Sequence, residues 1–292
     1  MKRTILVILI LATITLFQIS SAYSADTDAN EIIMGTDDLE QVSLIYKHGE
    51  LLSCKVLRIV ETKTSNNIIS LEAFPHMPEL EELYIAAGVQ LSNYDVLKSL
   101  CSLKVLALPS KGIIDISFLS SQPNLDTLDL SRNSIEDIAI ISKLKNLRYL
   151  DISHNNITDI IALKDTTNLE ELYLDHNTNL QDLSGISDLS NLENLSFSDT
   201  KVSDLTPISK LSNLSVLSFA NCKIDKIDSL CGLSNMFYLD MRANNIRKID
   251  ALAEMNDLTF LYIYGNPISD CSILNRLKHI DPELARTSNP IE

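Results

Sequence analysis

The chain has 292 residues and a formal net charge of −15, with 24 Lys and Arg against 39 Asp and Glu. Hydrophobic residues make up 45% of it, which is typical of a globular protein rather than a disordered one. The acidic balance disfavours binding to DNA or RNA, whose phosphates need a basic surface. The seven glycines are too widely spaced for a G-x-G-x-x-G dinucleotide loop or a two-glycine P-loop.

Residues 1–22 have the pattern of a secretory signal peptide. Lys2 and Arg3 precede an uncharged apolar run over residues 4–19, and small residues follow at 20–22. The run is short for a membrane-spanning helix, which needs about 20 apolar residues, so a retained anchor is the weaker alternative. We therefore expect a bacterial exported protein, secreted or held in the periplasm or at the cell surface, with no membrane span after cleavage.

The segment 23–53 is expected to form a linker and a helical cap. Asp37 and Glu40 make a D-x-x-E helix start, apolar residues follow on one face, and Gly49 would end the helix. The predicted helix spans residues 38–48. It would cover the first of the repeats that follow, because a terminal repeat otherwise exposes its core.

An internal repeat of 22 or 23 residues occupies residues 54–281. The pattern is L-x-x-L-x-L-x-x-N-x-I-x-x-I, which is seen clearly in the copies that begin at Leu125 and Leu147. A degenerate copy begins at Cys54. The nine regular copies begin at Leu80, Leu103, Leu125, Leu147, Leu169, Leu192, Leu214, Met236 and Leu258. A register held over so many copies is a specific sign of a solenoid.

The repeat itself predicts local structure. In L-x-x-L-x-L, alternate side chains point into the core and out of it, as in a short β-strand, and stacked copies would form one parallel sheet. The asparagine after each strand turns the chain, and its amide can bond backbone groups that the turn leaves unpaired. The members of this asparagine ladder are Asn133, Asn155, Asn177, Asn244 and Asn266.

These copies resemble leucine-rich repeats of the short bacterial class. The likeness is to internalins, and also to the leucine-rich regulatory subunit of protein phosphatase 1, through the N-x-I-x-D-I element at residues 133–138 and 155–160. The resemblance implies an α/β solenoid: a right-handed horseshoe of about nine to ten repeats with a parallel concave β-sheet. Because repeats this short leave little room, we expect a mostly 3₁₀ or irregular convex side. Residues 282–292 would form a C-terminal tail.

The five cysteines do not form an evident disulfide framework. Cys54, Cys222 and Cys271 occupy core or ladder positions, whereas Cys101 and Cys231 lie in convex connections of distant repeats. No two of them share a position in adjacent repeats. We therefore expect mostly free thiols that pack as small hydrophobic groups.

The outward strand positions are the candidate binding surface, because the core does not constrain them. They carry aromatic and charged side chains, which protein interfaces use as anchors. The alternatives are solvated tyrosines in the middle of the array and a cover for the last repeat at its end. The predicted partner-binding residues are Tyr149, Tyr173, Asp129, Asp151, Asp175, His154, His176, Tyr238, Asp240, Tyr262 and Tyr264.

No catalytic motif is recognisable, so we expect no enzymatic activity and no cofactor. His154 and His176 occupy one position in adjacent strands, but a solvated polar face is a better interpretation than a metal site. The predicted function is a monomeric, exported, non-enzymatic module that binds a protein of a host cell or of the envelope. The alternative is a scaffold that binds a phosphatase or another enzyme. A metal-dependent or hydrolytic enzyme is the least supported.

Overall fold

The structure is a computed structural model, and it describes residues 31–35, 54–60, 68–69, 77–91 and 93–277. Short strands dominate these residues, most of them only three residues long. The strands are β1 (Glu31–Gly35), β2 (Val56–Val60), β3 (Ile68–Ile69), β4 (Glu82–Ile85), β5 (Gln90–Leu91), β6 (Val105–Ala107), β7 (Thr127–Asp129), β8 (Tyr149–Asp151), β9 (Glu171–Tyr173), β10 (Asn194–Ser196), β11 (Val216–Ser218), β12 (Tyr238–Asp240) and β13 (Phe260–Tyr262).

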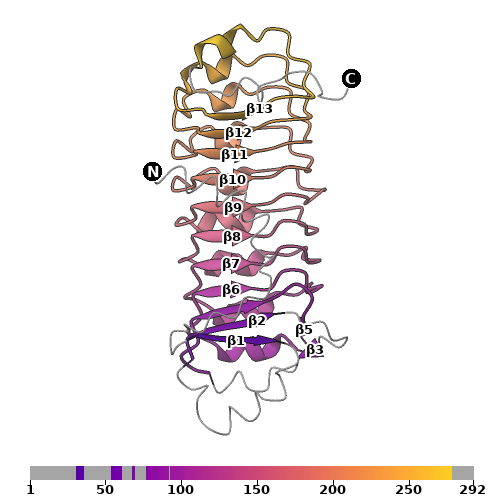
Figure 1. Ribbon diagram of the computed structural model, residues 1–292, viewed down its shortest axis with the longest axis vertical. Coiled ribbons are helices and arrows are strands. Elements are labelled where there is room, and N and C mark those ends of the chain that lie inside the picture. The colour runs from indigo at the N-terminus through magenta and orange to yellow at the C-terminus, as the bar shows by residue number, and fades with distance from the viewer. Residues whose placement is uncertain (1–30, 36–53, 61–67, 70–76, 92, 278–292) are drawn as a thin grey trace.

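Within these residues, eleven strands form one parallel sheet in the order β1-β2-β4-β6-β7-β8-β9-β10-β11-β12-β13. Each turn of the chain adds one strand, so the sheet climbs as a ladder along the long axis of the molecule (Figure 1). A separate two-stranded sheet pairs β3 with β5. The predicted solenoid with a parallel concave sheet is confirmed.

The convex side consists of 3₁₀ helices joined by turns, as predicted. A 3₁₀ helix rises steeply and stays short, so it fits a return path of a few residues. Nine of them, η4 to η12, lie in the described part of the chain. Their bounds are Asp95–Ser99, Ser117–Ser121, Ala139–Lys143, Ile161–Asp165, Ser184–Ile186, Thr206–Ile208, Asp228–Leu230, Asp250–Glu254 and Ser272–Arg276.

The first strand, β1, was not predicted from the repeat pattern. It pairs in parallel with β2, from Glu31 opposite Val56 to Gly35 opposite Val60. An open sheet edge is a template for unwanted pairing, and β1 covers that edge of β2. The predicted signal peptide at 1–22, the helix at 38–48 and the tail at 282–292 lie outside the described residues.

The repeats stack in strict register, so that equal positions form straight columns. Leu128, Leu150 and Leu172 pair in adjacent strands, and all three are fully buried. The register holds even where a repeat is one residue longer, since Glu171 still pairs with Asn194. The Leu and Ile columns therefore form one continuous core, which each repeat can complete only with its neighbours.

The ladder asparagines join each turn to the repeat before it. Asn177 is fully buried, and its Nδ2 donates to the carbonyl oxygens of Leu174 at 2.9 Å and Ile152 at 3.0 Å. Its Oδ1 accepts from the backbone N–H of Ile157 at 3.0 Å. Because these backbone groups are buried, each amide satisfies polar groups that would otherwise be costly to leave unpaired.

A second asparagine ladder, not recognised in the sequence, precedes the strands β7 to β12. Asn146 Nδ2, for example, donates to the carbonyl oxygen of Pro123 at 3.1 Å, one repeat earlier. Six residues make this bond: Asn124, Asn146, Asn168, Asn191, Asn213 and Asn235. The signal was present as an Asn directly before the first apolar residue in six of the nine regular repeats.

A recurrent aspartate begins many of the convex helices. Asp204 Oδ1 accepts from the backbone N–H of Thr206 at 2.8 Å, and this bond together with the Thr206 hydroxyl holds the Asp204 pKa below its ordinary value. An aspartate two residues before a helix satisfies the N–H of the first helical residue in this way, as in an Asx-turn. The same bond is made by Asp115, Asp137, Asp159, Asp182 and Asp270. Part of the acidic excess is therefore structural.

Candidate functional site on the concave sheet face

Two outward tyrosines on β8 and β9 lie against each other. The ring centroids of Tyr149 and Tyr173 are 5.5 Å apart with the planes at 45°, and the Tyr173 hydroxyl donates to Glu171 Oε2 at 2.8 Å. Both side chains are half-buried. Burial, followed by the nearby carboxylates, raises the pKa of both hydroxyls above the ordinary value, so both are neutral at physiological pH.

A row of carboxylates runs beside these rings. Asp129 on β7 and Asp151 on β8 are direct register partners, so two like charges face each other across neighbouring strands. Each accepts one backbone N–H at 2.9 Å, from Ser131 and Ser153 respectively. Burial and then the charge of Asp129 raise the pKa of Asp151 to about 7.

Asp175 extends this row at the end of β9. Its Oδ1 accepts from the Ser196 hydroxyl at 2.5 Å and from the backbone N–H of Ser198 at 2.7 Å, and burial raises its pKa. Among the described residues, no Lys or Arg forms an ion pair with Asp129, Asp151 or Asp175. We name one group the central cluster: Asp129, Tyr149, Asp151, Glu171, Tyr173 and Asp175.

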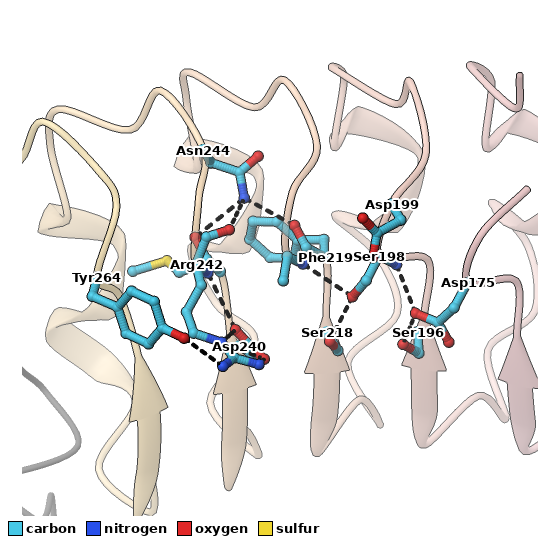
Figure 2. A network of polar contacts seen from close by, with 12 residues as sticks. Asp175, Ser196, Ser198, Asp199, Ser218, Phe219, Asp240, Arg242, Asn244 and Tyr264 are labelled. Carbon is cyan, nitrogen blue, oxygen red and sulfur yellow. Dashed lines mark hydrogen bonds and ion pairs between the residues drawn. The ribbon is translucent and has the colours of Figure 1, made fainter. Parts of the chain in front are cut away.

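The next two strands carry small side chains. Ser198 Oγ lies 2.9 Å from Ser218 Oγ and accepts from the backbone N–H of Ala220 at 3.0 Å. Figure 2 shows this chain of polar contacts, which starts at Asp175 and crosses the serines toward the last strands. Small serine side chains therefore separate two regions of larger side chains on this face.

An ion pair organises the C-terminal part of the face (Figure 2). Arg242 Nε donates to Asp240 Oδ1 at 2.8 Å, and Arg242 Nη2 donates to Asp240 Oδ2 at 2.5 Å. Arg242 Nη1 also donates to the Tyr264 hydroxyl at 2.8 Å. Asp240 is only 2% exposed, and its hydrogen bonds raise the already high pKa of Arg242 further.

Aromatic rings surround this ion pair. The ring centroids of Tyr238 and Tyr262 are 5.5 Å apart, and the Arg242 guanidinium carbon lies 5.4 Å from the Tyr262 centroid and 5.2 Å from that of Tyr264. Those distances allow cation–π attraction. We name a second group the C-terminal cluster: Tyr238, Asp240, Arg242, Phe260, Tyr262 and Tyr264.

The two histidines stack at the turn that follows the strands. The ring centroids of His154 and His176 are 4.0 Å apart, and both residues have left-handed backbone φ angles, of 53° and 58°. Burial, then His176 and Arg132, lowers the pKa of His154 to about 4, so it is neutral at pH 7. Within the part of the chain that the structure describes, no group of three or more His, Cys, Asp or Glu could hold a metal ion.

The comparisons with known proteins agree with this fold. A family model described as leucine-rich repeats in two copies matches residues 123–165, 145–189, 167–210 and 190–232. An internalin of Listeria monocytogenes, inlF, superposes with a TM-score of 0.75 at 25% identity and covers 81% of this chain and 69% of its own. The chain is an internalin-like leucine-rich repeat protein.

Two further solved structures are similar to this leucine-rich repeat protein. Internalin C2 of Listeria monocytogenes has a TM-score of 0.60 at 26% identity, over 63% of this chain and 80% of that one. The third structure is the ectodomain of the Arabidopsis thaliana receptor kinase GASSHO1/SCHENGEN3, solved in complex with CASPARIAN STRIP INTEGRITY FACTOR 2. It has a TM-score of 0.64 at 22% identity, and the match covers 81% of this chain and 33% of that one. No curated protein sequence matches the chain significantly.

The fold distributes the predicted binding residues over three places. Tyr149, Tyr173 and the three aspartates of the row come together in the central cluster, and Tyr238, Asp240, Tyr262 and Tyr264 in the C-terminal one. The histidines stand at the turn after the strands, where the backbone N–H of His154 donates to the carbonyl oxygen of Asp175 at 2.7 Å. Glu171 and Arg242 were not among the predicted residues, although both stand at outward strand positions where the repeat register could have identified them.

None of the five cysteines forms a disulfide bond, and all five lie within the described residues. Cys222 Sγ lies 3.4 Å from Thr200 Oγ1 and 3.4 Å from the carbonyl oxygen of Phe197, so it occupies its place in the asparagine ladder as a weak donor. Thr200 donates to the same carbonyl at 2.9 Å. Two non-asparagine residues thus continue the ladder between Asn177 and Asn244.

Proposed function

We propose that the protein is a non-enzymatic protein-binding module, exported through its leader, that presents its concave sheet to a protein ligand. Support comes from its repeats, because leucine-rich repeat relatives serve as protein-binding modules. By likeness to internalins, the ligand is a protein of a host cell or of the envelope. No helix of the described residues is long and apolar enough to cross a membrane.

The observation that carries the proposal is the pair of tyrosine contacts on one face. Tyr149 with Tyr173, and Tyr238 with Tyr262, stand half-exposed at outward positions on either side of the low serine strands. Such rings provide large contact areas at low entropic cost because they have few rotatable bonds. Stacked strands hold them rigidly, so little order is lost on binding.

The proposal is tested by capture and affinity measurement. The purified full chain is used to capture proteins from host-cell surface and envelope extracts, and each captured protein is identified, purified and titrated. We expect the double variant Tyr149→Ala/Tyr173→Ala to weaken binding about 30-fold, since truncated anchor residues cost about 2 kcal/mol. Circular dichroism on heating should show the variant folded.

The matched control is Ile161→Ala on η7, an exposed apolar residue that lies away from the sheet. It should bind as the unmodified chain does. Equal loss in both variants, or no loss in the tyrosine variant, would contradict a concave binding site. Export is tested separately by the intact mass of the protein in fractions of the native cell, where an uncleaved cytosolic chain would favour the scaffold alternative.

A further inference from the structure

The central cluster contains carboxylates that form no ion pair with a Lys or Arg of the described residues. Asp129 and Asp151 face each other, and the charge of Asp175 also acts on Asp151. Hydrogen bonds from serines partly stabilise the negative charges, and the charge of Lys111 acts on Asp129, but no Lys or Arg of the described residues forms an ion pair with Asp151 or Asp175. Half-buried like charges without a counter-ion repel each other.

A second, independent observation lies beside the cluster. Asn194 on β10 pairs in register with Glu171 and is only 2% exposed. Its Oδ1 has no hydrogen-bond partner among the described residues, and its side chain lies near enough to Tyr173 to lower the pKa of that hydroxyl. An unpaired buried acceptor costs about 1–3 kcal/mol, so a ligand that donates to it gains that energy.

The C-terminal cluster has the same tyrosine and aspartate positions, and there an arginine bonds to the carboxylate. Asp240 occupies the same position in its repeat as Asp151, and each follows a tyrosine by two residues. At Asp240, the guanidinium of Arg242 bonds the carboxylate and lies near the rings of two tyrosines. The equivalent of Arg242 in the central repeat is Ser153, whose side chain carries no positive charge.

We propose that the central cluster is a subsite for a basic side chain of the protein ligand. Its guanidinium or ammonium group lies against Asp129 and Asp151, beside the rings of Tyr149 and Tyr173, and a further N–H donates to Asn194 Oδ1. The partner thus supplies the cation that Arg242 supplies in the C-terminal cluster. This inference rests on the proposed function, because it names the chemistry of the group that the concave face receives.

The test uses small probes and backbone-amide NMR on the full chain. The first probe is N-acetyl-arginine amide, and its control is N-acetyl-citrulline amide, which has nearly the same shape without the charge. We expect saturable shifts with the arginine probe alone, at Tyr149, Asp151, Tyr173 and the side-chain amide of Asn194. Asp151→Asn should weaken this binding about tenfold.

The control variant is Asp204→Asn, which removes one negative charge at the start of η9, outside the cluster. It should leave the affinity for the arginine probe unchanged. Equal shifts with both probes, or shifts outside the cluster, would overturn the proposal. Spermidine is the third probe, and binding more than about tenfold tighter than the arginine probe would identify a free polyamine as the occupant, against the proposal.

The pH dependence gives a readout that a merely structural aspartate would not. A cation favours the ionised carboxylate, and the pKa of Asp151 is about 7 in the free chain. Affinity for the arginine probe should therefore rise about tenfold between pH 6 and pH 8, and this rise should vanish in Asp151→Asn. The charged or titratable groups facing Asp151 are Asp129, Tyr149, Tyr173 and Asp175.

The results separate this inference from the proposed function. If the arginine probe binds while no protein is captured, the cation site stands and protein binding fails. If a captured protein binds equally well to the unmodified chain and to Asp151→Asn, protein binding stands and the subsite is overturned.

Discussion

The two tyrosine clusters share a layout but differ in their electrostatics. In each, a tyrosine and an aspartate alternate along one strand, Tyr149 with Asp151 and Tyr238 with Asp240. Asp240 is nearly inaccessible and bonded by Arg242, whereas Asp151 is half-buried with a pKa raised to about 7. The C-terminal cluster contains its own cation, whereas ionising the carboxylates of the central cluster costs free energy.

This difference shows how a regular scaffold acquires a site. The repeat fixes which side chains point outward and at what spacing, and a single residue at the seventh position decides whether a carboxylate is neutralised internally. With arginine there, the strand is closed to a cationic ligand. With serine there, the carboxylate has no internal cation and its pKa rises to about 7, so its ionisation at neutral pH costs free energy that the proposed cationic group would offset.

Removing the internal cation should have the largest effect. Arg242→Met leaves Asp240 almost inaccessible and without its ion pair, and the cost of such a buried charge is about 2–3 kcal/mol after allowance for the partly exposed Arg242. The free energy of unfolding in urea measures this loss. A loss below about 0.5 kcal/mol would show that the pair contributes no more than a surface salt bridge.

Neutralising the central carboxylate should act in the opposite direction. The pKa of Asp151 is raised from 3.8 to about 7, so below pH 4 the group is protonated in both states, and above pH 7 the folded chain must carry an unfavourable charge. Asp151→Asn should therefore stabilise the fold by about 1 kcal/mol at pH 8, discounted for partial exposure, and not at pH 4.

Urea unfolding at the two pH values measures that difference. Asp204→Asn serves again as the matched control, since the pKa of Asp204 is lowered by hydrogen bonds and its charge is stabilising at neutral pH. Its loss should lower stability slightly at pH 8. If Asp151→Asn is less stable than the unmodified chain at pH 8, the ionised Asp151 does not destabilise the fold.

Copying the arginine into the central repeat should produce the smallest change in stability. Ser153→Arg places a guanidinium two residues after Asp151, as Arg242 stands after Asp240. We expect a gain of about 0.5–1 kcal/mol, typical of a partly exposed ion pair, and complete loss of arginine-probe binding. Unfolding in urea and the NMR titration measure both effects. If Ser153→Arg still binds the arginine probe, Asp151 is not part of the cation site.

The regular part of the fold could be predicted from sequence because it depends on short-range pattern. Apolar periodicity indicated the strands of the long sheet from β4 onward, and repeat length indicated the 3₁₀ helices, whereas the small sheet of β3 and β5 was not predicted. The strand β1 precedes the first repeat and carries no repeat motif, so the apolar periodicity did not indicate its pairing with β2. The second asparagine ladder and the capping aspartates were visible as patterns, but their roles depend on which carbonyl or N–H lies within reach.

The electrostatics of the site could not be predicted in the same way. The sequence indicated that Asp151 and Asp240 both face outward, but a pKa shift depends on burial and on neighbours from other repeats. The unpaired Asn194 Oδ1 is a property of packing between β9 and β10, which no single repeat specifies. Ser153 and Arg242 occupy the same repeat position, but the sequence does not show that Arg242 bonds to Asp240 and Tyr264.

The strict strand register also fixes the distance between the two tyrosine pairs. Strands lie about 4.8 Å apart, and four steps separate β8 and β9 from β12 and β13, so the two tyrosine pairs are about 19 Å apart along the sheet. An extended peptide advances about 3.3 Å per residue and needs about six residues to reach from one pair to the other. A ligand that engages both must therefore present its anchors at that separation, whatever its own fold.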